Sequence, residues 1–181
     1  MGKKSAKLDI LGEILLNWRI NKVIPYIKGY LLDIGCGTNK LVRKHGNGLG
    51  IDVFQFGDAD MILVDTSQTP FEDKTFDTIS IIASLNHIPN REQVIEEVQR
   101  ILKDNGRLII TMIPDTISKI WHKIREPWDK DQTERSMKEG EVYGMSTLDI
   151  KNILDNNNFE IKTIKKFMFR INNIFIAKKK I

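Results

Sequence analysis

The sequence is poor in cysteine and histidine, which limits the chemistry that it can support. Cys36 is the only cysteine, so neither an intrachain disulfide nor a cysteine-based metal cluster can form, as is typical of a reducing cytoplasm. His45, His87 and His122 are the only histidines, and no H-x-x-x-H pair occurs. We therefore predict no metal site and do not expect a metal hydrolase.

Long apolar runs are also missing from the chain. No stretch of 18 apolar residues is present, and the N-terminus lacks the apolar core of a secretory signal. We therefore expect a cytoplasmic protein without a membrane partner. With 181 residues, 41% of them hydrophobic and 29% charged, the chain has the size and composition of a single globular domain over residues 1–181.

Excess positive charge is scarce outside the two ends of the chain. The formal net charge is +4, with Lys3, Lys4 and Lys7 near the start and three more lysines at 178–180. Without these lysines, acidic residues outnumber basic ones, so a nucleic-acid groove is not favoured. The lysines can serve as solubilising ends, with RNA or anionic-membrane contact as the alternative. We expect a small-molecule substrate and a monomer or homodimer.

The most informative segment that is present is a glycine turn. The apolar run 31–34, which contains Asp33, is followed at once by Gly35 and Gly37. Glycine tolerates positive φ and close approach of a ligand, and a following helix start offers free N–H groups. In an open α/β sheet, ligands bind at the carboxyl ends of the strands, where this turn would lie. The spacing matches neither the G-x-G-x-x-G motif nor the P-loop.

Short apolar runs alternate with segments of helical periodicity. The apolar runs predict strands at 30–34, 48–52, 61–64, 78–83 and 107–113, followed by a strand pair at 160–170 and 173–179 with a turn near 172–173. The periodic segments predict helices at 5–28 and 40–44, a third from Asn90 to the turn at 104–106, and a fourth at 147–156. Asn90 and Gln93 have the spacing of a capping box, and Ser146 or Thr147 would cap the last helix. Such alternation indicates a parallel sheet with right-handed crossovers.

Asp33 and the two glycines resemble the first motif, "DIGCGTG", of the class I S-adenosylmethionine (SAM) dependent methyltransferases. The resemblance continues in register through 48–52, 61–65, 70–77, 84–89 and 98–108, and is greatest to the methyltransferase type 11, ubiquinone-biosynthesis-like members. It implies an α/β fold, a three-layer Rossmann-like sandwich with a seven-stranded, mostly parallel sheet of order 3-2-1-4-5-7-6 and one antiparallel strand. Asn39 replaces the third glycine of many relatives, and asparagine tolerates left-handed backbone.

The resemblance also implies a cofactor site for SAM, with S-adenosylhomocysteine (SAH) as the product. Asp52 would accept hydrogen bonds from the ribose hydroxyls, and Asp65 would lie near the adenine or, alternatively, cap a loop. Asp33 would hold the turn or the cofactor's amino group. Cys36 is expected to be a small packed side chain rather than a nucleophile. The full predicted set is Asp33, Gly35, Cys36, Gly37, Asp52, Val53, Asp65, Thr66 and Ser84.

The catalytic residues are less well defined. Methyl transfer from a sulfonium is an in-line displacement that alignment alone can accelerate, and a general base helps only if the acceptor must lose a proton. His87 and His122 are the candidates for such a base. The alternatives are a structural hydrogen bond for His87 and an ordinary exposed or core position for His122.

Aromatic residues provide the candidate substrate contacts. Trp121, Trp128 and Tyr143 could line a pocket or make cation–π contacts with the sulfonium, although the helical spacing of Trp121 also fits a core position. Residues 1–28, as an N-terminal helical cap, and 114–146, as a substrate-side insertion, would shape this side of the domain.

The interpretation that we favour is methyl transfer from SAM to an oxygen or nitrogen of a small molecule. The segment after the fourth strand is not the "NPPY" box of enzymes that methylate amino groups of DNA and RNA. The alternatives are an RNA or protein methyltransferase that uses the lysine-rich ends, a non-catalytic SAM-binding module, and a nucleotide-dependent oxidoreductase.

Overall fold

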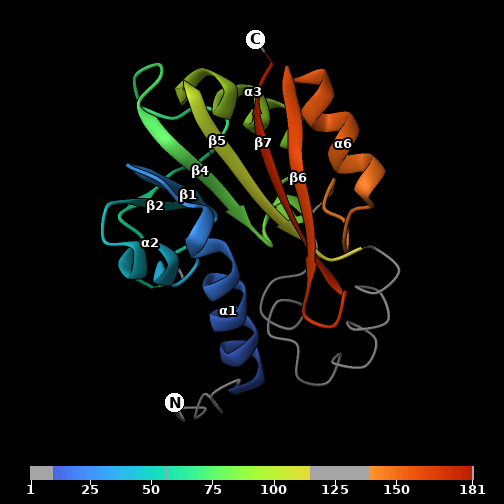
Figure 1. Ribbon diagram of the computed structural model, residues 1–181. Coiled ribbons are helices and arrows are strands. Elements are labelled where there is room, and N and C mark those ends of the chain that lie inside the picture. Colours follow the sequence, from blue (N-terminus) through green and yellow to red (C-terminus); the bar gives the residue numbers. More distant parts are fainter. Residues whose placement is uncertain (1–9, 56, 115–138, 181) are drawn as a thin grey trace.

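The computed structural model describes residues 10–55, 57–114 and 139–180, which form one sheet with helices packed around it (Figure 1). The strands are β1 Leu31–Ile34, β2 Gly48–Asp52, β3 Met61–Ile62, β4 Phe76–Ile82, β5 Leu102–Met112, β6 Phe159–Phe167 and β7 Asn172–Lys179. The helices are α1 Ile10–Val23, α2 Lys40–His45, α3 Arg91–Ile101 and α6 Thr147–Asn156, with 3-10 turns η1 Ile24–Tyr26 and η2 Leu85–His87.

The sheet has the strand order that the resemblance implied. The described strands form a seven-stranded sheet in the order β3-β2-β1-β4-β5-β7-β6. β1, β2, β3, β4 and β5 pair in parallel, whereas β7 is antiparallel to both β5 and β6. The order reverses between β1 and β4, and this is where open α/β sheets form their ligand crevice. The predicted fold class is therefore confirmed.

Two apolar clusters cover the two faces of the sheet. One joins α3 and α6 to the sheet through Val94 and Ile150, and the other joins α1 through Ile20 and Val23. Successive residues of a strand point to opposite faces, and Leu31 accordingly lies in the second cluster while its neighbour Leu32 lies in the first. Most side chains of β1 and β4 are apolar because both faces are covered.

The first helix packs against the sheet. Ile20 and Val23 are buried on it, and Glu13 forms an ion pair with Lys40 at the start of α2. This contact places the first turns of α1 beside the helix that follows the glycine turn. The role of residues 1–28 as a cap over a ligand remains a prediction, and residues 1–9 lie outside the described part of the chain.

The boundary between α3 and β5 differs from the prediction. The helix ends at Ile101, and Leu102 already pairs with Phe76 of β4. The ladder then shifts register and resumes with Thr78 opposite Arg107. The residues at 104–106, predicted to be a turn, therefore lie within an irregular part of β5. The prediction was wrong because the pairing of Leu102 with Phe76 depends on a distant segment.

The predicted capping box at the start of α3 is also wrong. Asn90 occupies the N-cap position but makes no side-chain capping hydrogen bond. Its amide instead donates to both carboxylate oxygens of Asp65, each at 3.0 Å. In contrast, Ser146 caps α6 as predicted and forms a capping box with Asp149.

The C-terminal strand pair turns earlier than predicted. β6 ends at Phe167 and β7 begins at Asn172, so the turn spans residues 168–171 rather than 172–173. Phe167 and Met168 are buried in the cluster under α1, and this packing fixes where the turn begins. β3 is likewise shorter than predicted, since it ends at Ile62 and Val64 is fully exposed. None of the described helices has the length and apolar character that crossing a membrane requires.

Candidate functional site

The glycine turn follows β1 and is hydrogen-bonded to the end of β2. The N–H groups of Gly35 and Cys36 both donate to the carbonyl of Ile51, at 2.9 and 3.1 Å. Gly35 and Gly37 have φ values of +71° and +53°, in the left-handed region that favours glycine. A Cβ on Gly35 would lie 2.7 Å from the Ser84 side chain, whereas a Cβ on Gly37 would meet nothing within 4 Å. Gly37 therefore borders open space at the carboxyl edge of the sheet.

Asp52 ends β2 beside this open space. Asp52 is only 6% exposed, and its Oδ2 accepts a hydrogen bond of 2.9 Å from the N–H of Gly37. Its Oδ1 accepts from the N–H groups of Val53 and Phe54, at 2.8 and 3.0 Å. A carboxylate has about four acceptor positions, so one remains for a ligand hydroxyl. Val53, next to Asp52, is 42% exposed.

Asp33 is buried under the turn. Its Oδ1 accepts a hydrogen bond of 2.6 Å from the Ser80 hydroxyl on the neighbouring strand β4. Burial raises the pKa of Asp33 to about 7, with the Ser80 hydrogen bond acting in the opposite direction and the nearby negative charge of Asp52 adding to the rise. The site therefore contains a carboxyl group that changes its charge near neutral pH.

Cys36 lies in the turn as a half-buried thiol. Burial raises its pKa to about 12, and the negative charges of Asp33, Asp52 and Asp60 add to this rise. Because the thiolate is the reactive form, the thiol is a poor nucleophile at neutral pH. The geometry agrees with the predicted packed side chain.

Asn39 closes the turn with a left-handed backbone, at φ +56°, as expected for a residue that replaces glycine. Its amide also donates to the carbonyl of Asp58 and to Oδ2 of Asp60, both at 2.9 Å. Asp60 Oδ2 in turn accepts from the N–H of Gly50 in β2, at 2.7 Å. These contacts tie the loop after β2 to the glycine turn. The motif alone could not predict them.

Asp65 and its neighbours follow β3 at the same edge. The Asp65 carboxylate accepts from Ser67 N–H at 2.8 Å and from the Asn90 amide, and these contacts, with Asn90 the largest, hold its pKa below the usual range. Thr66 is buried, at 5% exposure. This arrangement fits the loop-capping alternative for Asp65. A contact of Asp65 or Thr66 with an adenine ring stays a prediction.

The predicted catalytic and substrate residues are only partly described. His87 lies in η2, directly after β4, with its Nδ1 3.4 Å from Oε2 of Glu141. Tyr143, two residues after Glu141 in the chain, is 37% exposed. Trp121, His122 and Trp128 lie outside the described residues. Glu141 was missed at the sequence level, since nothing local connects it to His87.

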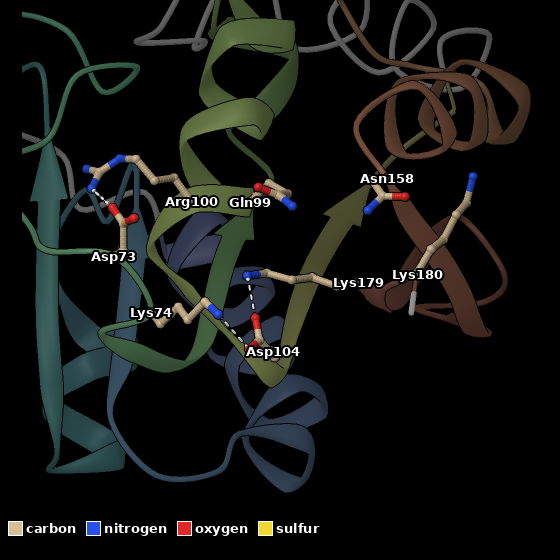
Figure 2. A pocket seen from close by; sticks show the side chains of 8 residues that line it. All are labelled: Asp73, Lys74, Gln99, Arg100, Asp104, Asn158, Lys179 and Lys180. Atoms are coloured by element: carbon tan, nitrogen blue, oxygen red, sulfur yellow. Dashed lines mark hydrogen bonds and ion pairs between the residues drawn. The ribbon is translucent and has the colours of Figure 1, made fainter.

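A groove of about 400 Å³ lies at the opposite edge of the sheet (Figure 2). Its lining comes from the segment before β4, the end of α3, the start of β5, the turn between α6 and β6, and the end of β7. It comprises Asp73, Lys74, Gln99, Arg100, Asp104, Asn158, Lys179 and Lys180. Its cations are already paired with acids, as Lys74 is with Asp104 at 2.7 Å. This groove is remote from the glycine turn and supplies none of its chemistry.

The lysines at the end of the chain are engaged within the protein. Lys179 lies 3.5 Å from Asp104, and Lys180 lies 2.8 Å from Asp155. These contacts do not favour a free basic tail. In the three described ranges, no group of at least three His, Cys, Asp or Glu residues is arranged to hold a metal ion.

The carboxyl edge of the sheet brings three of the predicted cofactor residues together. Gly37 borders open space, Asp52 keeps one acceptor position of its carboxylate, and Asp33 supplies a buried carboxyl group beneath the turn. Binding of ribose hydroxyls by Asp52 stays a prediction. Residues 32–110, which contain all three, match the family model of the methyltransferase domain. Over residues 32–110 the chain therefore carries a domain of the class I SAM-dependent methyltransferases. The cofactor that this methyltransferase family implies is SAM, which becomes SAH.

Known proteins resemble this chain over part of their length. It is 30% identical over 135 residues to the methyltransferase GfsG of Streptomyces halstedii, covering 62% of this chain and 49% of that protein. It is 33% identical over 100 residues to the sterol 4-C-methyltransferase strm-1 of Caenorhabditis elegans, covering 45% of this chain and 30% of that protein. The chain thus spans half or less of the length of these relatives.

A solved structure shows the same fold at low sequence identity. A chain from the complex of the Haloferax volcanii Trm112 methyltransferase activator with a methyltransferase superposes with a TM-score of 0.71 at 13% identity. The match covers 94% of this chain and 93% of that one. It supports the fold assignment alone.

Proposed function

We propose that this methyltransferase transfers a methyl group from SAM to an oxygen or nitrogen atom of a small-molecule acceptor. The observation that carries the proposal is the contact between Asp52 and the N–H of Gly37 at the rim of open space. When bound, SAM supplies an electrophilic methyl group. The chain's own part is to hold the nucleoside through Asp52 and the turn and to align the acceptor, which needs no metal or covalent intermediate.

A small-molecule acceptor is supported by the apolar surface beside His87. Val142 and Tyr143 are 36% and 37% exposed, and the backbone of Val142 is hydrogen-bonded to Asn86, the neighbour of His87. One relative is named a sterol 4-C-methyltransferase, which supports a small acceptor and adds carbon as a third candidate for the acceptor atom. We also propose a monomer or homodimer, with residues 114–146 shaping the acceptor side.

Calorimetric titration of the full chain with SAH tests cofactor binding. Asp52→Asn removes a charged acceptor of hydrogen bonds, which are worth about 1.5–3 kcal/mol each, so we expect affinity to fall roughly 10- to 100-fold. Asp73→Asn, which changes an exposed carboxylate at the opposite edge, is the matched control and should leave affinity unchanged. A folded wild-type protein that gives no heat with SAH would contradict the proposal.

Incubation with ¹³C-methyl SAM and a fractionated extract of small metabolites tests transfer. The chemical shift of the labelled product distinguishes methyl groups on oxygen, nitrogen and carbon. A non-catalytic module would bind SAH without any fraction-dependent SAH release, and an oxidoreductase would bind NAD in competition with SAH. Labelling of RNA or protein rather than a small molecule would favour the macromolecular alternative.

A further inference from the structure

His87 is linked to the glycine turn through Ser84. η2 begins directly after Ser84, and the N–H of His87 donates to the carbonyl of Ser84 at 2.9 Å. The Ser84 side chain packs so closely on Gly35 that no Cβ would fit there. Its hydroxyl also donates to the carbonyl of Ile34, at 3.1 Å. These contacts fix the position of His87 relative to the end of β1.

A buried carboxylate faces one nitrogen of this imidazole. Oε2 of Glu141 lies 3.4 Å from Nδ1 of His87, and the two side chains are 2% and 27% exposed. Nε2 of His87 has no hydrogen-bond partner among the described residues. The ring thus presents Nδ1 to the protein and keeps Nε2 for another molecule. A carboxylate at Nδ1 selects the neutral tautomer in which Nδ1 carries the proton and Nε2 is the base.

The backbone on both sides of Glu141 is held in place. Val142 donates its N–H to the carbonyl of Asn86 at 2.9 Å, and the Asn86 amide donates to the carbonyl of Val142 at 3.0 Å. On the other side, the guanidinium of Arg91 donates to the carbonyl of Gly140. These hydrogen bonds dock the segment without help from the Glu141 side chain.

We propose that Glu141 positions His87 as the general base that deprotonates the methyl acceptor. This inference rests on the proposed methyl transfer and specifies an acceptor atom that carries a proton, such as a hydroxyl oxygen. Nε2 of His87 takes the proton, while an electron pair of the oxygen forms the new bond to the methyl carbon. The carbon–sulfur bond breaks, and its electron pair remains on sulfur. The imidazolium that results faces the Glu141 carboxylate.

The tautomer of His87 tests the proposal without an acceptor. The full chain, labelled with ¹⁵N-histidine, is studied by long-range ¹H–¹⁵N NMR with and without saturating SAH, and His45→Gln and His122→Gln assign the signals. We expect the neutral ring of wild-type His87 to carry its proton on Nδ1. Glu141→Met, which has no oxygen, should abolish this preference, and Glu141→Gln, which keeps a carbonyl acceptor, should restore it. Glu139→Met, at an exposed position, is the control.

Each outcome separates the alternatives. If Glu141→Met lowers the thermal midpoint but leaves the His87 ring signals unchanged, Glu141 only docks the segment and the proposal is overturned. Wild-type His87 with its proton on Nε2 would overturn it as well, even if Glu141→Met failed to fold. Failure of wild-type protein to bind SAH would instead refute the proposed function, since the tautomer is also measured without SAH.

Discussion

Asp33 is expected to make the stability of this domain depend on pH between about 4 and 7. The folded state raises its pKa from 3.8 to about 7, chiefly through burial. A raised carboxyl pKa means that the folded state binds the proton more tightly than the unfolded state does. The unfolding free energy therefore falls as pH rises from 4 to 7 and levels off above that. At about 1.4 kcal/mol for each pKa unit, the full effect is on the order of 4 kcal/mol.

The substitution Asp33→Asn isolates this effect. An asparagine oxygen can still accept the hydrogen bond of the Ser80 hydroxyl, but no charge is buried at any pH. We expect the variant and the wild type to have similar stability near pH 4. Near pH 8 the variant should be more stable by a few kcal/mol. Urea unfolding at pH 4, 5, 6, 7 and 8 measures the difference, in which the titration of all other groups cancels.

Ser80→Ala provides the matched test of the mechanism. The Ser80 hydroxyl opposes the rise in the pKa of Asp33. Its removal should therefore raise this pKa further, so that the unfolding free energy continues to fall at pH values above 7. A wild-type minus Asp33→Asn difference that stays constant across the pH range would refute the reasoning, as would one that grows in favour of the wild type at high pH. Asp33→Asn should also bind SAH more weakly than the wild type. Such a loss of affinity would explain why a destabilising carboxyl group is kept at this position.

Three further predictions concern the turn and the last helix. Gly35→Ala should lower the unfolding free energy by more than Gly37→Ala, because both substitutions add a Cβ at positive φ but only the one at residue 35 crowds Ser84. Equal losses of stability would contradict this. Gly37→Ala should instead weaken SAH binding, as measured by titration. Cys36 should react with iodoacetamide at pH 8 far more slowly in the folded protein than in urea, as measured by mass spectrometry, because burial raises its pKa to about 12; equal rates would exclude this. Ser146→Ala should cost about 1 kcal/mol in urea unfolding by removing the capping box of α6; an unchanged unfolding free energy would count against it.

Local signals were sufficient where structure depends on neighbouring residues. The glycines at 35 and 37 require positive φ, and the capping box of Ser146 lies within one helical turn, so both could be predicted from the sequence. The strand order came from the resemblance to the family, because periodicity shows strands but not their neighbours. The resemblance over residues 48–52 also placed Asp52 at the end of the second strand, but its hydrogen bond with the glycine turn was not predicted, and its contact with a ribose stays a prediction.

Predictions failed where a distant partner decides the structure. The Asn90 amide binds Asp65, 25 residues away, instead of capping its own helix. Glu141 meets His87 across 54 residues, so no local pattern could pair them. In the β6–β7 turn, three successive residues, Met168 to Arg170, adopt positive φ without any glycine. The burial of Phe167 and Met168 outweighs the local preference that favoured the Asn172-Asn173 step.

The position of the Asn39 side chain limits which residues can occupy position 50. A Cβ on Gly50 would lie 2.1 Å from Oδ1 of Asn39 and 2.9 Å from Cβ of Cys36, so both side chains require glycine at position 50. Homologues that retain the third glycine at position 39 lack the nearer of these two side chains but keep the contact with residue 36. Position 50 should consequently co-vary with positions 36 and 39, and Asn39→Gly should lessen, without removing, the cost of Gly50→Ala.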